Sequence, residues 1–82
     1  MNIALISTDK LPVPPIAGGA VQLYIEGILP YISKHHRVTV FSIDHPGLKP
    51  EEEKDGVKHV RLAAKDRAEY VSNLKGRLTE GF

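Results

Sequence analysis

NIALIS, residues 2–7, is a short and nearly continuous apolar run near the start of the chain. Periodicity alone does not separate a buried strand from a helical segment of this length. The segment LPVPP, residues 11–15, settles the choice, because proline cannot continue a helix and pushes the residue before it into an extended conformation. The run therefore predicts a strand that is covered on both faces, the type found in parallel sheets.

A helix is predicted after this strand, once a loop over residues 8–18 has ended at Gly18-Gly19. Apolar residues then recur at helical spacing, at Val21, Ile25, Ile28 and Ile32. We expect three polar residues of this segment to face solvent, namely Gln22, Glu26 and Ser33. The helix should run from about residue 19 to 34, with a bend near residues 26–30, because Pro30 removes one backbone donor.

The rest of the chain predicts two more strands and a second helix. RVTVFS, residues 37–42, and the alternating VKHVRL, residues 57–62, are rich in residues that favour strands, and residues 51–56 read as a charged, exposed loop. A second amphipathic helix is expected over residues 64–75, ended by Gly76. The predicted fold is α/β in the order β-α-β-β-α, with a three-stranded, mostly parallel sheet and a right-handed crossover.

Composition describes a small globular chain with balanced charge. The 82 residues are 41% hydrophobic and 26% charged, with a net charge of +1, which favours neither nucleic acid nor an anionic membrane as the partner. There is no cysteine, so neither a disulfide nor a thiolate metal site can form. No apolar stretch approaches the length of a membrane span, and the start lacks the features of a secretory signal. A cytoplasmic location is the prediction.

Gly18 and Gly19 are the best candidates for binding. Two glycines let the backbone approach a ligand closely, and the helix that follows offers free N–H groups and a partial positive charge, which suit phosphate. The alternative is a simple tight turn into a helix. The chain contains neither G-x-G-x-x-G nor G-x-x-x-x-G-K-[ST], which argues against a dinucleotide site and against a P-loop ATPase.

Other polar residues favour structural roles. Asp44 is expected to cap Gly47 in a turn rather than to bind a ribose, and His35 and His36 to interact with the helix dipole rather than with a metal. The pattern leaves two alternatives for His59, a buried side chain or one that is exposed to solvent. Further polar residues carry no supported catalytic pattern: Ser7, Ser33, Ser42, His45 and Glu51–Glu53. Asp9 and Lys10 lie in the proline-rich loop beside this candidate site, where they either touch a ligand or are ordinary residues of a surface loop. We assign no catalytic residue, metal or cofactor to the chain.

The order of these segments resembles the amino-terminal end of a retaining glycosyltransferase. The apolar strand, the proline-rich loop, Gly18-Gly19-Ala20-Val21 and the segment KHHRVTVF, residues 34–41, are similar to the GT-B type, glycosyltransferase family 4. The loop running into Gly-Gly-Ala-Val resembles the subgroup of spore-coat glycosyltransferases of bacilli. The resemblance is good over residues 2–43 and loose beyond them.

The resemblance implies a domain organisation and a reaction. Such enzymes have two Rossmann-like domains around a cleft, and they move a hexose from a nucleotide-sugar donor to an acceptor without a metal. Residues 1–82 would be part of the amino-terminal domain, and the fragment alone would be inactive because the donor domain and its glutamate pair are absent. Gly18 and Gly19 match the loop that approaches the donor phosphates, and His36 matches a structural turn histidine. Two departures are His35, where the family commonly has glycine, and Pro30 within the helix.

Two other functions remain open. One is a small Rossmann-type module that binds a nucleotide or phosphate through Gly18 and Gly19; the other is a non-catalytic interaction domain with Tyr24 and Tyr31 as contact residues. Because residues 2–7 would have a neighbouring strand on one side only, we also expect the chain to form homo-oligomers through the exposed edge of this first strand.

Overall fold

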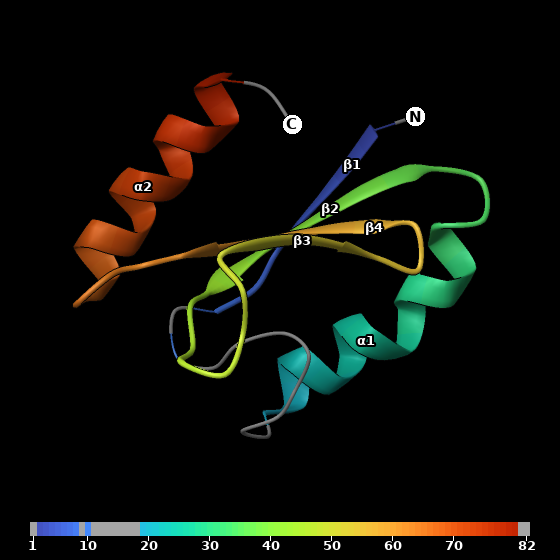
Figure 1. Ribbon diagram of the computed structural model, residues 1–82, viewed down its shortest axis with the longest axis horizontal. Coiled ribbons are helices and arrows are strands. Elements are labelled where there is room, and N and C mark those ends of the chain that lie inside the picture. Colours follow the sequence, from blue (N-terminus) through green and yellow to red (C-terminus); the bar gives the residue numbers. More distant parts are fainter. Residues whose placement is uncertain (1, 9, 11–18, 81–82) are drawn as a thin grey trace.

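The computed structural model describes residues 2–8, 10 and 19–80 (Figure 1). The predicted proline-rich loop, Asp9 and Gly18 lie outside the described residues. Four strands and two helices follow one another along the chain: β1 (Asn2–Ile6), α1 (Ala20–Ile32), β2 (Arg37–Ile43), β3 (Glu51–Lys54), β4 (Val57–Leu62) and α2 (Arg67–Glu80). The α/β class and the three predicted strands are confirmed, and β3 is an additional strand.

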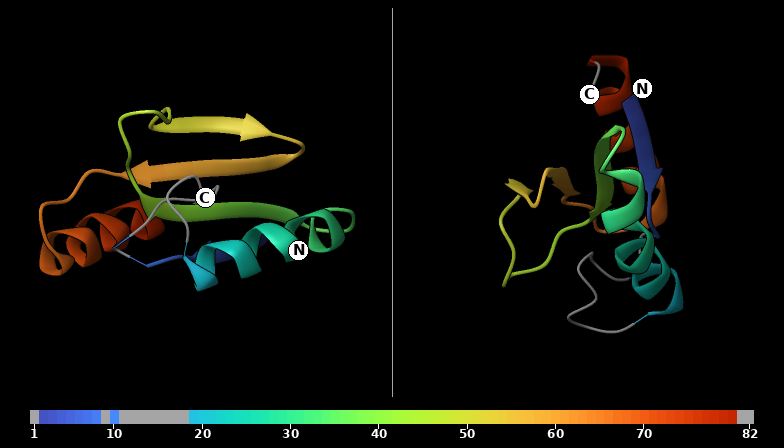
Figure 2. Two further views of the ribbon diagram at one scale, coloured as in Figure 1. Left: turned by 90° about the horizontal axis from the view of Figure 1, so that it is seen from below. Right: turned by 90° about the vertical axis from the view of Figure 1, so that its right-hand side faces the viewer.

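The strands form one mixed sheet in the order β1-β2-β4-β3. β2 lies between two parallel neighbours, since Ile3 pairs with Val38 on one side and Val57 pairs with Val38 on the other. β3 runs antiparallel to β4 and lies at the far side of the sheet from β1, which Figure 2 shows from below. The expectation of three strands was therefore wrong in number, while the parallel pairing of the three predicted strands is correct.

β3 and β4 form a hairpin around Asp55 and Gly56. Both residues have positive φ, 53° and 78°, as in the two-residue turns that match the twist of a hairpin. Glu51–Lys54, expected to be part of an exposed loop, is instead an edge strand whose side chains are all charged. Charged side chains are a common feature of edge strands, because they discourage pairing with another chain.

α1 covers one face of the sheet, which we call the α1 face. Its buried residues are Gln22, Ile25 and Leu29, and the two apolar ones pack on buried valines of the sheet: Val38, Val40 and Val57. The helix is unbroken through Pro30, although proline cannot supply an N–H to the carbonyl one turn earlier. The expectation that Val21 faces the core and Gln22 faces solvent was wrong, since Val21 is 46% exposed and Gln22 is 2% exposed.

α2 covers the opposite face, the α2 face, so that the sheet lies between the two helices (Figure 1). Tyr70 and Leu74 are its buried residues, and they pack on four apolar side chains of β2 and β4: Phe41, Ile43, Val60 and Leu62. The helix begins at Arg67 rather than residue 64 and continues past residue 75 to Glu80. Gly76 therefore lies inside the helix, and its expected role at the helix end was wrong.

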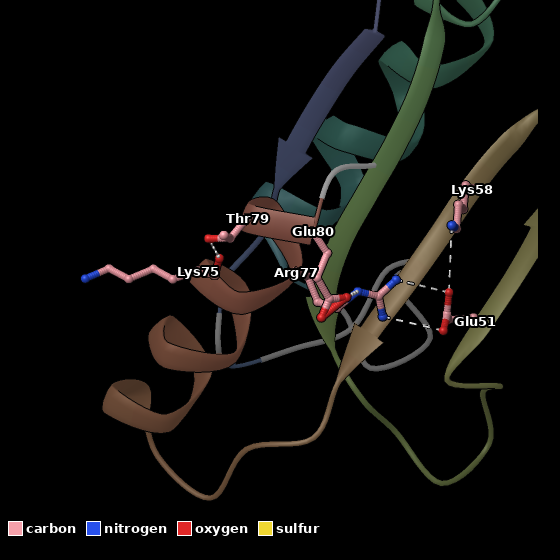
Figure 3. A network of polar contacts seen from close by, with 6 residues as sticks. All are labelled: Glu51, Lys58, Lys75, Arg77, Thr79 and Glu80. Carbon is pink, nitrogen blue, oxygen red and sulfur yellow. Dashed lines mark hydrogen bonds and ion pairs between the residues drawn. The ribbon is translucent and has the colours of Figure 1, made fainter.

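Ion pairs connect the last turn of α2 to the hairpin (Figure 3). Arg77 reaches both carboxylate oxygens of Glu51 at 3.3 and 3.4 Å, and Lys58 approaches the same carboxylate at 3.8 Å. The hydrogen bond from Arg77 lowers the pKa of Glu51 below its ordinary value. The groups are partly exposed, so the network orients α2 on the hairpin more than it stabilises the fold.

Candidate functional site

The candidate site lies where the parallel strands end. β1, β2 and β4 share one direction, so their carboxyl ends meet at one edge of the sheet. α1 is the element after β1 and α2 the element after β4, and both helices also begin at this edge (Figure 1). Ligands of open α/β sheets bind outside the carboxyl ends of the strands.

Gly19 is the residue before the first turn of α1, and its backbone requires glycine. Its φ of 105° and ψ of 127° lie in a region that side chains with a Cβ rarely adopt. The carbonyl of Gly19 accepts the first helical hydrogen bond from Leu23 at 3.0 Å. Among the described residues no side chain caps this end, and no acidic residue lies in the first turn, so the end keeps the partial positive charge of a helix start. Gly18, the other predicted ligand, lies outside the described residues.

The side chain of Gln22 joins the first turn of α1 to the end of β1. Its amide nitrogen donates to Thr8 Oγ1 at 2.7 Å and lies 3.3 Å from Ser7 Oγ. These bonds hold the start of the helix over the carboxyl end of the strand. Sequence reasoning missed this residue, and the one signal it gave was a polar residue three positions after Gly19, in the first turn of the helix.

A row of polar side chains crosses the α1 face at the carboxyl edge. Ser42 and Arg61 are paired across β2 and β4, and Ser7 lies beside them on β1's continuation, with its N–H donating to the Phe41 carbonyl at 2.8 Å. Ser7, Ser42 and Arg61 are 4%, 0% and 4% exposed. The next rows toward the amino edge are largely apolar, so polarity on this face increases toward the predicted site.

Arg61 is the charged member of this row, and Nη1 of its guanidinium bonds to the hairpin side of the fold. It donates to the carbonyl of Lys49 at 2.9 Å and to Glu52 Oε1 at 2.8 Å. The hydrogen bond from Arg61 lowers the pKa of Glu52. In contrast, Ser42 Oγ is buried and has no hydrogen-bond partner within the described parts of the chain.

Tyr70 brings α2 to the same edge. Its hydroxyl lies 3.0 Å from the carbonyl of Ser7 and 3.4 Å from that of Phe41, which are neighbouring backbone groups at the ends of β1 and β2. The tyrosine is 4% exposed. Both helices therefore contact the end of β1, one through Gln22 and the other through Tyr70.

A basic cavity of about 510 Å³ opens at this edge beside the start of α2. It is lined by Lys10, Ala64, Lys65, Asp66 and Arg67. Lys10, predicted as a possible ligand contact, thus lies at the carboxyl edge. Unlike α1, α2 is capped, because Asp66 Oδ1 accepts the N–H of Glu69 at 2.8 Å.

A second cavity, of about 400 Å³, lies between α1 and the hairpin. Leu29 of α1 and Val57 and His59 of β4 are among its lining residues. His59 is buried, and its Nδ1 has no hydrogen-bond partner among the described residues. Burial lowers the pKa of His59, and the nearby Arg61 lowers it further, so the imidazole is neutral at pH 7.

The remaining predicted residues are spread over the fold. The N–H of Gly47 is bonded by His45 Nδ1 at 3.2 Å, so the expected cap by Asp44 was wrong. Asp44 instead donates its own N–H to the Leu62 carbonyl at 3.1 Å. His36 follows α1, with a buried Nδ1 that has no partner among the described residues. The described residues contain no group of three or more His, Cys, Asp or Glu side chains that could hold a metal. No helix within them is long and apolar enough to cross a membrane.

Two proteins of Bacillus subtilis are similar to this chain. Spore coat protein SA is 56% identical over 62 residues, which are 76% of this chain and 16% of that protein. A putative glycosyltransferase, YtcC, is 43% identical over 72 residues, which are 88% of this chain and 18% of that protein. The chain thus spans less than a fifth of the length of the curated relatives it matches.

Two further comparisons find no counterpart. No family model matches the sequence. No solved structure matches it either. The predicted resemblance to spore-coat glycosyltransferases of bacilli is nevertheless confirmed by the two relatives: over most of its length, the chain is homologous to part of a spore coat protein and to part of a putative glycosyltransferase of Bacillus subtilis.

Proposed function

We propose that the chain is part of the amino-terminal, Rossmann-like domain of a GT-B glycosyltransferase, in which the start of α1 approaches the phosphates of a nucleotide-sugar donor. The observation that carries the proposal is Gly19, which has a positive φ and precedes the first turn of α1 at the carboxyl edge of the parallel strands, with no side-chain cap among the described residues. Such a helix start favours anions through its free N–H groups and its dipole. The names of the two relatives, a spore coat protein and a putative glycosyltransferase, support a glycosyl transfer connected with the spore coat.

The proposed roles divide between this chain and the rest of a longer protein. This chain would supply backbone N–H groups to the donor phosphates and part of the acceptor side of the cleft. Most donor contacts, including a glutamate pair, would come from a second domain. The 82 residues alone would therefore bind a donor weakly and transfer no sugar, and the protein would act in the cytoplasm. The expected homo-oligomer also stays a proposal, supported by the pairing of β1 with β2 alone within the part of the chain that the structure describes.

Titration of the chain with UDP-glucose tests the site, read as amide chemical-shift changes by NMR. We expect the amides of Ala20, Val21 and Gln22 to shift in a saturable way, because they are the first N–H groups of α1. NAD and inorganic phosphate are the comparison ligands. A response to phosphate equal to the response to UDP-glucose would favour the small phosphate-binding module, and no response at these amides would contradict the site.

Two glycine variants separate loss of binding from loss of stability. Gly19→Ala and Gly56→Ala each place a Cβ at a positive φ, so both should destabilise the fold, by about 1–3 kcal/mol. Gly56 lies in the hairpin turn, away from the carboxyl edge. Only Gly19→Ala should abolish the shifts. Equal binding by both variants would contradict a role for the start of α1.

Reading the gene beyond codon 82 tests the domain assignment independently. Continuation into a second α/β domain is expected for a glycosyltransferase. A stop codon directly after Phe82 would contradict it and favour the small binding module.

A further inference from the structure

The cavity between α1 and the hairpin results from the way in which β2 is joined to β4. Neighbouring parallel strands are usually joined by a helix, and a right-handed crossover from β2 to β4 would place that helix on the same face as α1. The connection here, residues 44–56, is described in full and contains β3, which lies in the sheet instead. The cavity of about 400 Å³ therefore occupies the place that a helix over β4 would fill.

The cavity lies away from the side of the sheet at which a larger domain would continue. Further strands of the proposed domain would add at β1, because β3 is charged at every position and such an edge resists pairing. The cavity lies over β4, and β2 separates β4 from β1. Strands that extend the sheet at β1 therefore leave the cavity open.

The buried residues that line the cavity, which we call its floor, are Leu29, Val57 and His59. The first two are apolar, and His59, only 6% exposed, is the polar member of the floor. Its Nδ1 has no hydrogen-bond partner among the described residues. A buried polar atom without a partner is rare in folded proteins and calls for an explanation such as a bound molecule. The floor thus offers an apolar surface and one unused hydrogen bond.

The exposed residues that line the cavity, which we call its rim, include charges of both signs. Glu26 and Asp55 carry carboxylates and Lys54 carries an ammonium group. The structure shows no ion pair for these three among the residues it describes. A cationic ligand would meet Lys54, and an anionic ligand would meet the carboxylates. Neutral hydroxyl groups fit such a rim, because a hydroxyl donates to a carboxylate and accepts from an ammonium group.

We propose that this cavity binds a neutral carbohydrate, whose hydroxyls bond to His59 Nδ1 and to the charged rim while a C–H face of the sugar ring packs on Leu29 and Val57. A hydroxyl suits either tautomer of the neutral imidazole, because it can donate or accept. The volume of the cavity lies within the range of small-molecule sites, about 300–1,000 Å³.

This carbohydrate site is separate from the candidate phosphate site. The rim begins at Glu26, which lies about 9 Å along α1 from Ala20 at about 1.5 Å per residue. A sugar bound over β4 is therefore not the sugar that a donor would present at the start of α1. The inference does not depend on the proposed function, and each site can be present without the other.

Titration of the chain with glucose tests the proposal, read as amide and imidazole chemical shifts by NMR. The amides of Val57 and His59 and the His59 ring should shift in a saturable way at millimolar glucose. Glucuronate and protonated glucosamine keep the ring but add a charge, and both should bind more weakly than glucose. Tighter binding of either charged sugar would overturn the assignment to a neutral ligand. Saturable shifts confined to the start of α1, or none at all, would overturn the site.

Rim variants locate the contacts. Glu26→Ala and Lys54→Ala should each weaken glucose binding about fivefold, the effect of one ordinary hydrogen bond. Leu23→Ala and Glu53→Ala are the matched controls, because both residues are exposed, lie next to the cavity in sequence or structure and do not line it. Both controls should bind glucose normally. Normal binding by both rim variants would overturn the proposal.

His59→Phe tests the floor, because phenylalanine keeps a ring but offers no hydrogen bond. Glucose binding should be lost in this variant. Since His59 is buried, circular dichroism must show that the variant is folded. If it is not folded, the rim variants decide, because Glu26 and Lys54 are exposed.

Discussion

The amide nitrogen of Gln22 lies 2.7 Å from Thr8 Oγ1, so the first turn of α1 is attached directly to the residues that follow β1. Gln22 is 2% exposed, and Ser7, its second neighbour, is 4% exposed. A buried amide between two hydroxyls holds its neighbours in one geometry, because every alternative leaves a polar group without a partner. The position of the candidate phosphate site therefore depends on this side chain.

Gln22→Met should destabilise the fold by about 1–3 kcal/mol, because methionine has a similar shape but leaves the buried Ser7 hydroxyl and the partly buried Thr8 hydroxyl without their donor. Urea denaturation measures the change. Leu23→Ala is the control on the adjacent, exposed position and should change the free energy of unfolding by less than about 0.5 kcal/mol. A free energy of unfolding that is unchanged in Gln22→Met would show that these hydrogen bonds are weak.

Tyr70→Phe should destabilise the fold by about 1 kcal/mol, because it removes the hydroxyl that lies 3.0 Å from the Ser7 carbonyl. Tyr31→Phe, at a position that is 72% exposed, is the matched control and should have no measurable effect. Thermal unfolding followed by circular dichroism compares the two. Equal transitions for both variants would argue against a contribution from this contact.

Gly76→Ala should stabilise the fold by about 0.5–1 kcal/mol. The residue lies inside α2, and a Cβ placed there meets no atom within 4 Å. Alanine loses less conformational freedom than glycine when a helix forms. Gly56→Ala should instead lower the free energy of unfolding in the same experiment, because the φ of 78° at this position makes a Cβ unfavourable. A destabilising Gly76→Ala would mean that α2 is not continuous at this position.

His59 should make stability depend on pH below its ordinary pKa of 6.5. Its pKa is lowered in the fold by burial and by Arg61, so the unfolded chain binds the proton more readily. Stability is then full above pH 6.5 and decreases as the pH falls through the interval between the unfolded and folded pKa values. Glu51 and Glu52 have pKa values lowered from 4.5, so their contribution to stability is lost only at a lower pH, as they become protonated in the fold.

Denaturation midpoints measured between about pH 7.5 and pH 5 check this, with His59→Gln as the comparison. The variant should lose most of the slope in this interval, because glutamine does not titrate. A slope that is unchanged in His59→Gln would assign the effect to other groups.

The strands could be predicted because their residue types and positions agree. Residues 2–7, 37–42 and 57–62 combine apolar or β-branched residues with turn signals at their ends, and all three are strands in the sheet. The parallel pairing of the first two strands followed from the helix that was predicted between them. The open side of β1 also follows from this topology, since within the described residues no further strand lies beside it.

β3 was missed because its sequence, EEEK, has no apolar alternation. An edge strand that exposes its side chains needs none, and its pairing with β4 depends on the backbone and the turn. The available signal was Asp55-Gly56, a dipeptide that favours two-residue hairpin turns. Weighing the turn before the hydrophobicity would have identified the hairpin.

The buried face of α1 was misjudged by about one residue. Val21 fits the apolar spacing of the helix as well as Ile25 does. The local sequence also does not show that the Ser7 and Thr8 hydroxyls accept hydrogen bonds from the Gln22 amide. The same limit applies to Arg61, whose burial depends on Glu52 and the Lys49 carbonyl. Polar residues can be buried where partners from distant segments satisfy them, and a single segment does not reveal those partners.

The pairing distances along the chain also imply an order of assembly. Lys54 pairs with Val57 across the hairpin turn, Val38 pairs with Val57 at intermediate separation, and Asn2 pairs with Arg37 across the longest stretch of chain, which includes all of α1. Closing a longer loop costs more entropy before its contacts form. The hairpin should therefore form first and β2 should join it next, so that β1 is the last strand to dock and the first to detach. In hydrogen exchange, the strand that bears the open edge would be the most transient part of the sheet.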